Sequence, residues 1–261
     1  MADSPECLFV VRSWLVAKLE NQAAFLADLK RKRPNTQLPF DQAVTQIFKA
    51  RDHLNGLQGS VPVLRNQMMG IEGAASARYF GVIGKLPPKA FAFTSRSQRP
   101  ARDPVNACLN YGYGILYSMV DRSCILAGLD PFVGFLHTDN YNKTSLVFDL
   151  IEPFRIWVDR VVLHLFTGRK MKQEYFESTA NGVVLSKEVR GLLVQELNAY
   201  LDKKIDTAIK SATSSKRKRR IRRRDAIQAE AHTLANRLLG RDGGLPEIIE
   251  TRELFAEPKD T

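Results

Sequence analysis

Three side chains within residues 134–155 are of types that are costly to bury unless they are used. His137 ends one apolar segment, and Asp149 and Glu152 lie three residues apart in the next, "SLVFDLIEPFR". Residues at i and i+3 share one face of a helix. A buried ionised group must be paired, bound to a metal or neutralised. The spacing therefore indicates either a metal-dependent catalytic site or an ordinary carboxylate–arginine pair with Arg155, three residues further on.

A further candidate, Glu72, lies among small residues in "GIEGAASA", residues 70–77. Glycine lowers helix propensity but lets other backbones come close, so this carboxylate is expected to be buried. Alone, it would more often pair with a residue such as Arg78 or face solvent. Together with the histidine and the two acids above, it forms an oxygen-rich set with one imidazole. Such a set suits Mg²⁺ or Mn²⁺ better than zinc or copper.

The positive charge of the chain is concentrated in one place. The formal net charge is +11, and eight of the 39 basic residues lie in "KRKRRIRRR", residues 216–224. A dense basic block suits a phosphate backbone, because each neutralised phosphate releases a counterion. A solvated segment explains the block equally well. Combined with the candidate metal ligands, the charge indicates metal-dependent phosphodiester chemistry, in which the metal stabilises charge on the reacting oxygens.

Several other classes of protein are disfavoured. A GxSxG elbow, a P-loop and a Rossmann fingerprint are missing, and the other three histidines have no ligand partners nearby in the sequence. The three cysteines are far apart and in no CxxC pair, which argues against a disulfide framework or a zinc site. Neither a secretory signal nor an apolar run of roughly 18 residues is present, so we expect a cytoplasmic protein without a membrane span.

The elements that must position these residues are predicted to be helices, and the fold class all-α. Apolar residues recur at helical spacing over 7–31, 41–57, 61–83, 104–128, 145–167, 187–210 and 224–240. We expect one domain over 1–261, with the metal site within 60–167, a basic flexible segment at 211–224 and C-terminal helices within 225–255. Pro131 is expected to begin a helix that ends near His137. The proline-rich and basic stretch 84–103 is too long for an idle connector, which indicates a functional loop.

Four blocks, in this order, carry a resemblance to a known family: "GIEGAASARYF", "RDPVNACLNYGYGILYS", "AGLDPFVGFLH" and "SLVFDLIEPFR". They resemble the catalytic helical domain of the CRISPR-associated spacer integrases, the Cas1 family. The resemblance is strong over 60–167 and weaker on both sides. It implies a multi-helix catalytic domain of the integrase type, working in the cytoplasm of a prokaryote.

The resemblance also implies roles for individual residues. It makes Glu72, His137 and Glu152 the ligands of Mg²⁺ or Mn²⁺, with Asp149 as a second catalytic acid near them. It implies metal-dependent transesterification, in which the 3′ end of a captured DNA fragment is joined to a CRISPR repeat. Contacts to DNA are expected from basic residues in the loop, the site and the basic run: Lys143, Arg155, Arg96, Arg99, Arg102, Arg217, Arg219, Arg220, Arg222 and Arg223.

Relatives in this family normally carry a small β-rich domain before the helical one, whereas this chain begins almost at its first helix. We therefore expect either a naturally short form or one part of a fusion, for instance with a reverse transcriptase. The expected partners are double-stranded DNA, further copies of the chain and the small Cas2 protein. The alternatives are a mobile-element integrase or branched-DNA nuclease of the same family, and, from another class, a non-catalytic DNA-binding scaffold.

Overall fold

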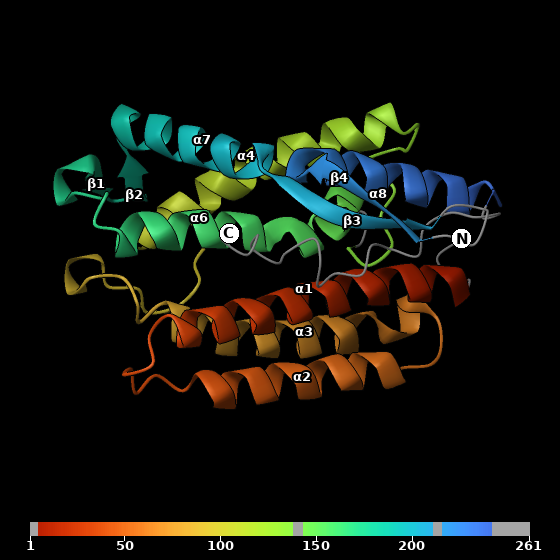
Figure 1. Cartoon of the computed structure of the whole chain (residues 1–261), viewed down its shortest axis with the longest axis horizontal. Helices are drawn as coiled ribbons and strands as arrows, with labels where there is room; N and C mark the ends of the chain where they lie inside the picture. The colour runs from red at the N-terminus through yellow and green to blue at the C-terminus, as the bar shows by residue number, and fades with distance from the viewer. Residues whose placement is uncertain (1–4, 138–142, 211–215, 242–261) are drawn as a thin grey trace.

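The computed structural model of the chain describes residues 5–137, 143–210 and 216–241, without the side chains of residues 5 and 206–219. Helices dominate the fold, and they form two groups that lie one above the other in Figure 1. In chain order the elements are α1 (Pro5–Arg31), α2 (Phe40–Gly56), α3 (Val61–Ile83), η1 (Lys89–Phe91), α4 (Pro104–Leu126), α5 (Ser145–Leu150), η2 (Glu152–Phe154), α6 (Arg155–Thr167), η3 (Gln173–Tyr175), β1 (Phe176–Thr179), β2 (Gly182–Leu185), α7 (Lys187–Asp202), β3 (Lys204–Lys210), β4 (Lys216–Arg222) and α8 (Arg223–Leu238).

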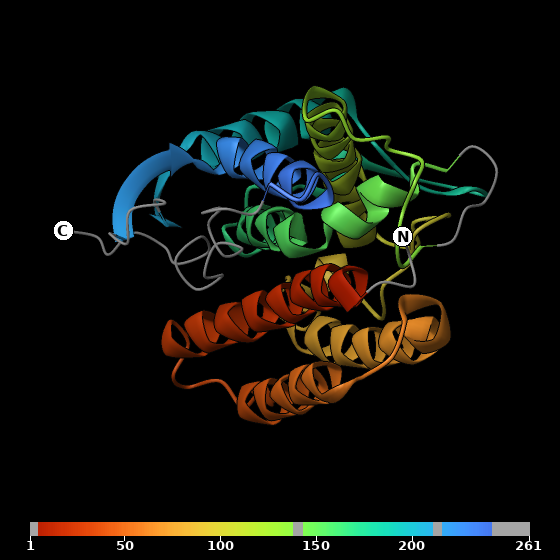
Figure 2. The ribbon, with the colours of Figure 1, turned by 90° about the vertical axis from the view of Figure 1, so that its right-hand side faces the viewer.

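The first group consists of α1, α2 and α3, which all contact one another and lie below the rest of the chain in Figure 2. The apolar residues of α1 recur every three or four positions, and Trp14, Leu15, Leu19 and Leu26 are all buried. The start of α3 has a favourable sequence, because Ser60 precedes it and a proline occupies its first turn. The buried residues of this group continue into the core of the second group, to which α1 presents one face.

The second group is built around α4, which contacts α6, α7 and α8. Helix α4 begins at a true cap, since the Asp103 side chain accepts a hydrogen bond from the Asn106 backbone N–H at 2.8 Å. The β1–β2 hairpin is antiparallel and also contacts α4, while Val183 N–H donates to the carbonyl of Ala101 at 2.9 Å. The hairpin thereby holds the end of the 84–103 loop.

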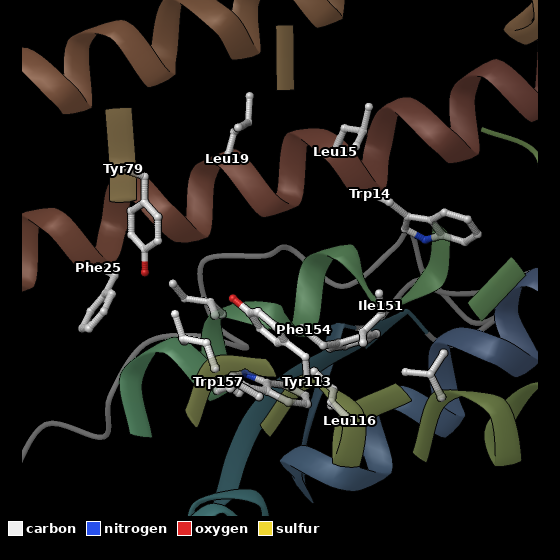
Figure 3. Close-up of a cluster of buried hydrophobic side chains, with 14 of the residues drawn as sticks. Trp14, Leu15, Leu19, Phe25, Tyr79, Tyr113, Leu116, Ile151, Phe154 and Trp157 are labelled. Atoms are coloured by element: carbon white, nitrogen blue, oxygen red, sulfur yellow. The ribbon is translucent and has the colours of Figure 1, made fainter. Parts of the chain in front are cut away.

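The two groups meet where α1 contacts η2 and α6. Figure 3 shows large core side chains from α1, α3, α4 and α6 gathered at this junction, Trp14 and Trp157 among them. Polar contacts cross it too: Asn21 Nδ2 donates to the Pro153 carbonyl at 2.9 Å, and the Tyr79 hydroxyl donates to Asp159 Oδ2 at 3.0 Å. The junction is therefore packed and hydrogen-bonded, with polar side chains at defined positions.

Gly112 allows α4 and α6 to approach closely, because a Cβ there would lie 2.5 Å from Val158 Cγ1. We expect Gly112→Ala to lower the free energy of unfolding by about 1–3 kcal/mol through overpacking. Gly114 is the matched control on the same helix, since its added Cβ would meet open space. Gly114→Ala should leave stability unchanged or raise it by about 0.5–1 kcal/mol. Urea denaturation measures both, and equal losses in the two variants would contradict the packing argument.

The predicted all-α fold class is confirmed in part: helices dominate, but the described residues also form two β-hairpins. The helix predicted at 61–83 is present with those bounds. The single helix predicted over 145–167 is wrong, because Pro153 has no N–H to continue the helical hydrogen bonds and the chain tightens into η2. The helix expected from Pro131 to His137 is also wrong, since that stretch consists of turns and irregular chain.

Both β-hairpins were missed. The β1–β2 hairpin has a recognisable signal, Asn181–Gly182 with Gly182 at φ +102°, between two short apolar-containing runs. The helix predicted over 187–210 ends at Asp202, and β3 follows it. Within the segment predicted to be flexible, 211–224, residues 216–222 form β4, paired antiparallel with β3, and α8 begins at Arg223. Residues 211–215 and the predicted helical residues 242–255 lie outside the described residues.

Candidate active site

Two carboxylates from separate elements meet around a single ammonium group at the junction. Lys18 Nζ on α1 lies 2.5 Å from Glu72 Oε1 on α3 and 2.5 Å from Glu152 Oε2 on η2. The exposed fractions of the three side chains are 11% for Lys18, 21% for Glu72 and 5% for Glu152. Two of the three predicted metal ligands thus converge on one cation position, although 80 residues separate them in the chain.

Glu152 has a second cationic partner, since Arg155 Nε donates to its Oε1 at 2.9 Å. Burial alone would raise the pKa of Glu152, but Arg155 and Lys18 outweigh it and hold that pKa at about 2. Burial lowers the pKa of Lys18, but the two glutamates beside it have the larger effect, and the net pKa is raised. The carboxylate–arginine pair considered from sequence is therefore present, within a larger charged cluster.

Glu72 is held by a short chain of hydrogen bonds. Ser76 Oγ, one turn further along α3, donates to Glu72 Oε1 at 2.6 Å, and Gln22 Nε2 donates to Ser76 Oγ at 3.2 Å. Gln22 is 3% exposed, and its Oε1 has no hydrogen-bond partner in the described part of the chain.

The sequence-based prediction missed three residues of this cluster: Lys18, Gln22 and Ser76. The available signal was the pair of polar residues at i and i+4 within the apolar stripe of α1.

Asp149 does not line the cavity that the two glutamates share; it anchors the segment that carries His137. Its carboxylate accepts backbone N–H bonds from Phe135 at 2.6 Å, Leu136 at 3.0 Å and His137 at 3.1 Å. Its Oδ1 also lies 2.5 Å from His137 Nδ1. Asp149 thereby fixes both the backbone and the ring of His137, which itself lines that cavity.

Glu72, His137, Glu152 and Lys18 line a cavity of about 450 Å³. A larger cavity of about 940 Å³ adjoins it, because the two share Arg96, Gln98, Tyr113, His137 and Arg155 in their linings. Nearly half of the residues that line the larger cavity are cationic or aromatic, among them Arg99, Tyr117, Lys143, Phe148 and Arg190. The acidic cluster therefore lies at one end of a basic and aromatic groove.

The donor set of this cavity fits a hard divalent cation in kind, since it offers two carboxylates and an imidazole. The two carboxylates already converge on a cation, the Lys18 ammonium. As the side chains stand, no group of three His, Cys, Asp or Glu residues in the described ranges is close enough to hold a metal ion.

The basic residues predicted to contact DNA lie in different surroundings. Lys143 and Arg99 are exposed and line the larger cavity, and Arg102 is exposed outside it. Arg155 is half-buried beside Glu152, and its guanidinium also donates to the Tyr117 hydroxyl at 2.6 Å. Arg96 lines both cavities and is hydrogen-bonded to two asparagines of α4.

The 84–103 loop is fixed to α4 by amide side chains. Arg96 donates to Asn106 Oδ1 at 2.7 Å and to Asn110 Oδ1 at 2.6 Å, and Asn106 Nδ2 donates to the Ser95 carbonyl at 2.8 Å. The loop is thereby placed along both cavities. This position agrees with the prediction that the stretch is more than a connector.

The basic run is split between a strand and a helix. Arg220 and Arg222 are exposed, and Arg222 pairs with Asp225 at 3.0 Å. The side chains of Arg217 and Arg219 lie outside the described residues. Arg223 is 1% exposed, stacks on the Tyr200 ring at 4.1 Å and donates to the Tyr200 carbonyl. Its guanidinium thus holds α8 against α7, and Arg223 differs in this from the exposed arginines of the run.

Comparison with known proteins identifies the family to which this fold belongs. The family model described as CRISPR associated protein Cas1 matches residues 1–199. The chain belongs to the Cas1 family. The resemblance found in the four sequence blocks is thereby confirmed, and the Cas1 family accounts for the mostly helical architecture.

Among curated Cas1 proteins, the chain is 38% identical over 207 residues to CRISPR-associated endonuclease Cas1 1 of Archaeoglobus fulgidus, covering 75% of this chain and 60% of that protein. It is 34% identical over 234 residues to CRISPR-associated endonuclease Cas1 3 of Thermus thermophilus, covering 89% of this chain and 64% of that protein. The chain thus spans less than two thirds of the length of these relatives.

Solved structures show the same fold. A casposase bound to integration product has a TM-score of 0.78 and 25% identity, covering 98% of this chain and 67% of that one. A Cas6-RT-Cas1–Cas2 complex has a TM-score of 0.76 and 22% identity, covering 98% of this chain and 26% of that one. As for membranes, no helix in the described residues of this Cas1 family member is long and apolar enough to cross one.

Proposed function

We propose that this chain is a metal-dependent DNA integrase and endonuclease of CRISPR adaptation. It joins the 3′ ends of captured DNA fragments to a CRISPR repeat by transesterification. In each joining step the 3′ hydroxyl attacks a phosphodiester, a new ester bond forms, and the old bond breaks with release of a 3′ hydroxyl. The number of ester bonds is unchanged, so the reaction needs no external energy source.

The observation that carries this proposal is the convergence of Glu72 and Glu152 on one cation position at the end of a basic groove. Membership of the Cas1 family supports it, as does the name endonuclease carried by the relatives above. An acidic cluster alone would repel DNA. An acidic cluster at the end of a groove lined by arginine, lysine and tyrosine suits a phosphodiester that is guided to a metal.

Glu72, His137 and Glu152 are the residues that would hold the metal. A bound Mg²⁺ or Mn²⁺ supplies charge stabilisation to the phosphate and to the attacking or leaving oxygen. The chain itself supplies positioning: Asp149 fixes His137, and Ser76 fixes Glu72. Joining two esters in this way depends on alignment and electrostatics more than on a strong protein base.

Lys143, Arg99 and Arg96 are proposed to contact DNA phosphates along the groove, with Arg155 at its acidic end. Arg102, Arg220 and Arg222 are exposed elsewhere and are proposed to add affinity that does not depend on sequence. We propose the same role for Arg217 and Arg219.

Integration of both ends of a fragment needs two active sites, so we propose that the chain works as an oligomer in the cytoplasm of a prokaryote. Double-stranded DNA, as fragment and as repeat, is its substrate. The Cas2 protein and a fused or associated reverse transcriptase are proposed partners. Support comes from the structural similarity to a complex whose title names Cas6, RT, Cas1 and Cas2.

A mobile-element integrase is the second candidate, and one observation favours it. The casposase structure, whose title names an integration product, matches 98% of this chain with a TM-score of 0.78. The two candidates differ in target and share their chemistry. A plasmid that carries a CRISPR repeat and a plasmid that carries terminal inverted repeats separate them by which one receives the fragment.

The test is strand transfer of a short labelled duplex into a repeat-bearing plasmid, with Mg²⁺ or Mn²⁺ and with EDTA. Wild-type protein should give a metal-dependent joined product. Glu72→Ala and His137→Ala should reduce that product at least about 100-fold, because each removes a group that positions the reacting atoms. Variants as active as wild type, or a product that forms in EDTA, would reject the catalytic proposal. Tight DNA binding without any product would instead favour a non-catalytic scaffold.

A further inference from the structure

The ammonium of Lys18 lies in an unusual place for a lysine. It is surrounded by the side chains that are proposed to hold a metal, with both glutamates at 2.5 Å, and only 11% of its side chain is exposed. A lysine on an amphipathic helix normally extends its ammonium into water. Here the ammonium points inward to the junction of the two helix groups, so the fold positions a cation between the acids.

The charges of the cluster are balanced without any metal. Glu72 and Glu152 are matched by Lys18 and Arg155, the latter 2.9 Å from Glu152 Oε1. A divalent cation added to this balanced, largely buried group would create an excess of positive charge that burial makes costly. Metal binding therefore requires either movement of the Lys18 ammonium or the arrival of an anion, and the phosphate of DNA is the anion this groove suits.

An alternative position for the ammonium lies one turn along α1. Gln22 is four residues from Lys18, lines the same cavity and is 3% exposed. Its side-chain oxygen, Oε1, accepts no hydrogen bond from any of the described residues. Residues at i and i+4 are neighbours on a helix face, and the lysine side chain has four rotatable bonds. A buried acceptor without a donor is costly, so an approaching ammonium would satisfy it.

We propose that Lys18 is a built-in cation that competes with the metal for Glu72 and Glu152, so that the protein binds metal tightly only when a DNA phosphate binds with it. This inference rests on the metal site of the proposed function and assigns that site an order of events. Without DNA, Lys18 holds the two acids together. With DNA, the ammonium leaves the acids, and the phosphate balances the charge of the metal.

Binding of Mn²⁺ alone to the purified full chain, measured by isothermal titration calorimetry, tests the competition. Lys18→Met removes the competing charge and should tighten Mn²⁺ binding at least about tenfold, since a unit charge about 4 Å away has a large effect even at an effective dielectric constant of 20. Lys30→Met is the matched control on the same helix, because Lys30 pairs with Asp41 on the surface at 2.5 Å. Its Mn²⁺ affinity should equal that of wild type.

Lys18→Met brings two carboxylates together without a cation, so its melting temperature should fall in EDTA and rise more with Mn²⁺ than that of wild type. Lys18→Gln is the second variant if Lys18→Met folds poorly, because its amide can donate to one glutamate, and the same tightening is expected. Adding a short DNA duplex should tighten Mn²⁺ binding to wild type more than to Lys18→Gln.

Unchanged or weaker Mn²⁺ binding in both Lys18 variants would overturn the inference. The two proposals fail separately. Strand transfer by wild type, together with unchanged Mn²⁺ affinity in the variants, would reject the role of Lys18 alone. Tighter Mn²⁺ binding in the variants, without strand transfer by wild type under any condition, would reject the proposed function and retain the competition at the site.

Discussion

Glu152→Ala is expected to lower the free energy of unfolding by about 3–5 kcal/mol, because it removes a buried carboxylate and leaves two half-buried cations with too little negative charge beside them. Lys18 and Arg155 both depend on this carboxylate, at 2.5 Å and 2.9 Å. Strand transfer should be lost in the same variant. Glu196→Ala is the matched control, since Glu196 pairs with Lys170 at the surface at 2.6 Å, and it should cost less than about 1 kcal/mol.

The pH dependence of the free energy of unfolding gives a second test of the role of Glu152. The pKa of Glu152 is about 2 in the folded chain, against 4.5 for an ordinary glutamate. Between these values the unfolded chain binds a proton that the folded chain does not. The stabilisation is therefore complete above pH 4.5 and is lost as the pH falls toward 2. The stability difference between wild type and Glu152→Gln should shrink across that window in chemical denaturation, and a constant difference would contradict the ion-pair argument.

Asp149→Ala should slow strand transfer about 100-fold or more, because it releases the segment that holds His137. Three backbone N–H groups and the histidine ring lose their shared acceptor. Asp149→Asn should be nearly as damaging, since its NH₂ group would face donors where a carboxylate oxygen accepts. Hydrogen exchange at residues 135–137 should become faster in both variants.

The control for this prediction is Asp130→Ala. Asp130 Oδ1 accepts the Phe132 N–H at 2.9 Å, so it makes the same kind of contact, in an exposed turn a few residues earlier. It should leave strand transfer and the exchange at 135–137 close to wild type. Normal exchange at 135–137 in Asp149→Ala, or an unchanged rate of strand transfer, would refute the assignment of Asp149 as the residue that positions His137.

The helices could be predicted because their signals are local. Apolar spacing and a proline in the first turn define α3, and Asp103 caps α4. The failures also have identifiable causes. Pro153 divides one apolar stretch into α5, η2 and α6, and as a result Asp149 and Glu152 face different partners. The pairing of β3 with β4 is a contact between segments, which helical periodicity over 187–210 could not reveal.

The candidate site, like the fold, could be predicted only in part from the sequence. Glu72, His137 and Glu152 were predicted and line one cavity. Lys18 was missed because a lysine on a helix normally extends into water, and the burial of this one depends on contacts with α3 and η2. Gln22 was equally hidden. A rule that treats polar residues within an apolar stripe as informative would have found both.

The acidic cluster spans the boundary between the two helix groups, taking one residue each from α1, α3 and η2. The buried apolar side chains of the two groups form one continuous core, so the packing that holds each group together also holds the groups to each other. A shift of one group against the other would change the distance between Glu72 and Glu152. The geometry of the acid pair therefore depends on packing at the whole junction, far beyond the polar side chains themselves.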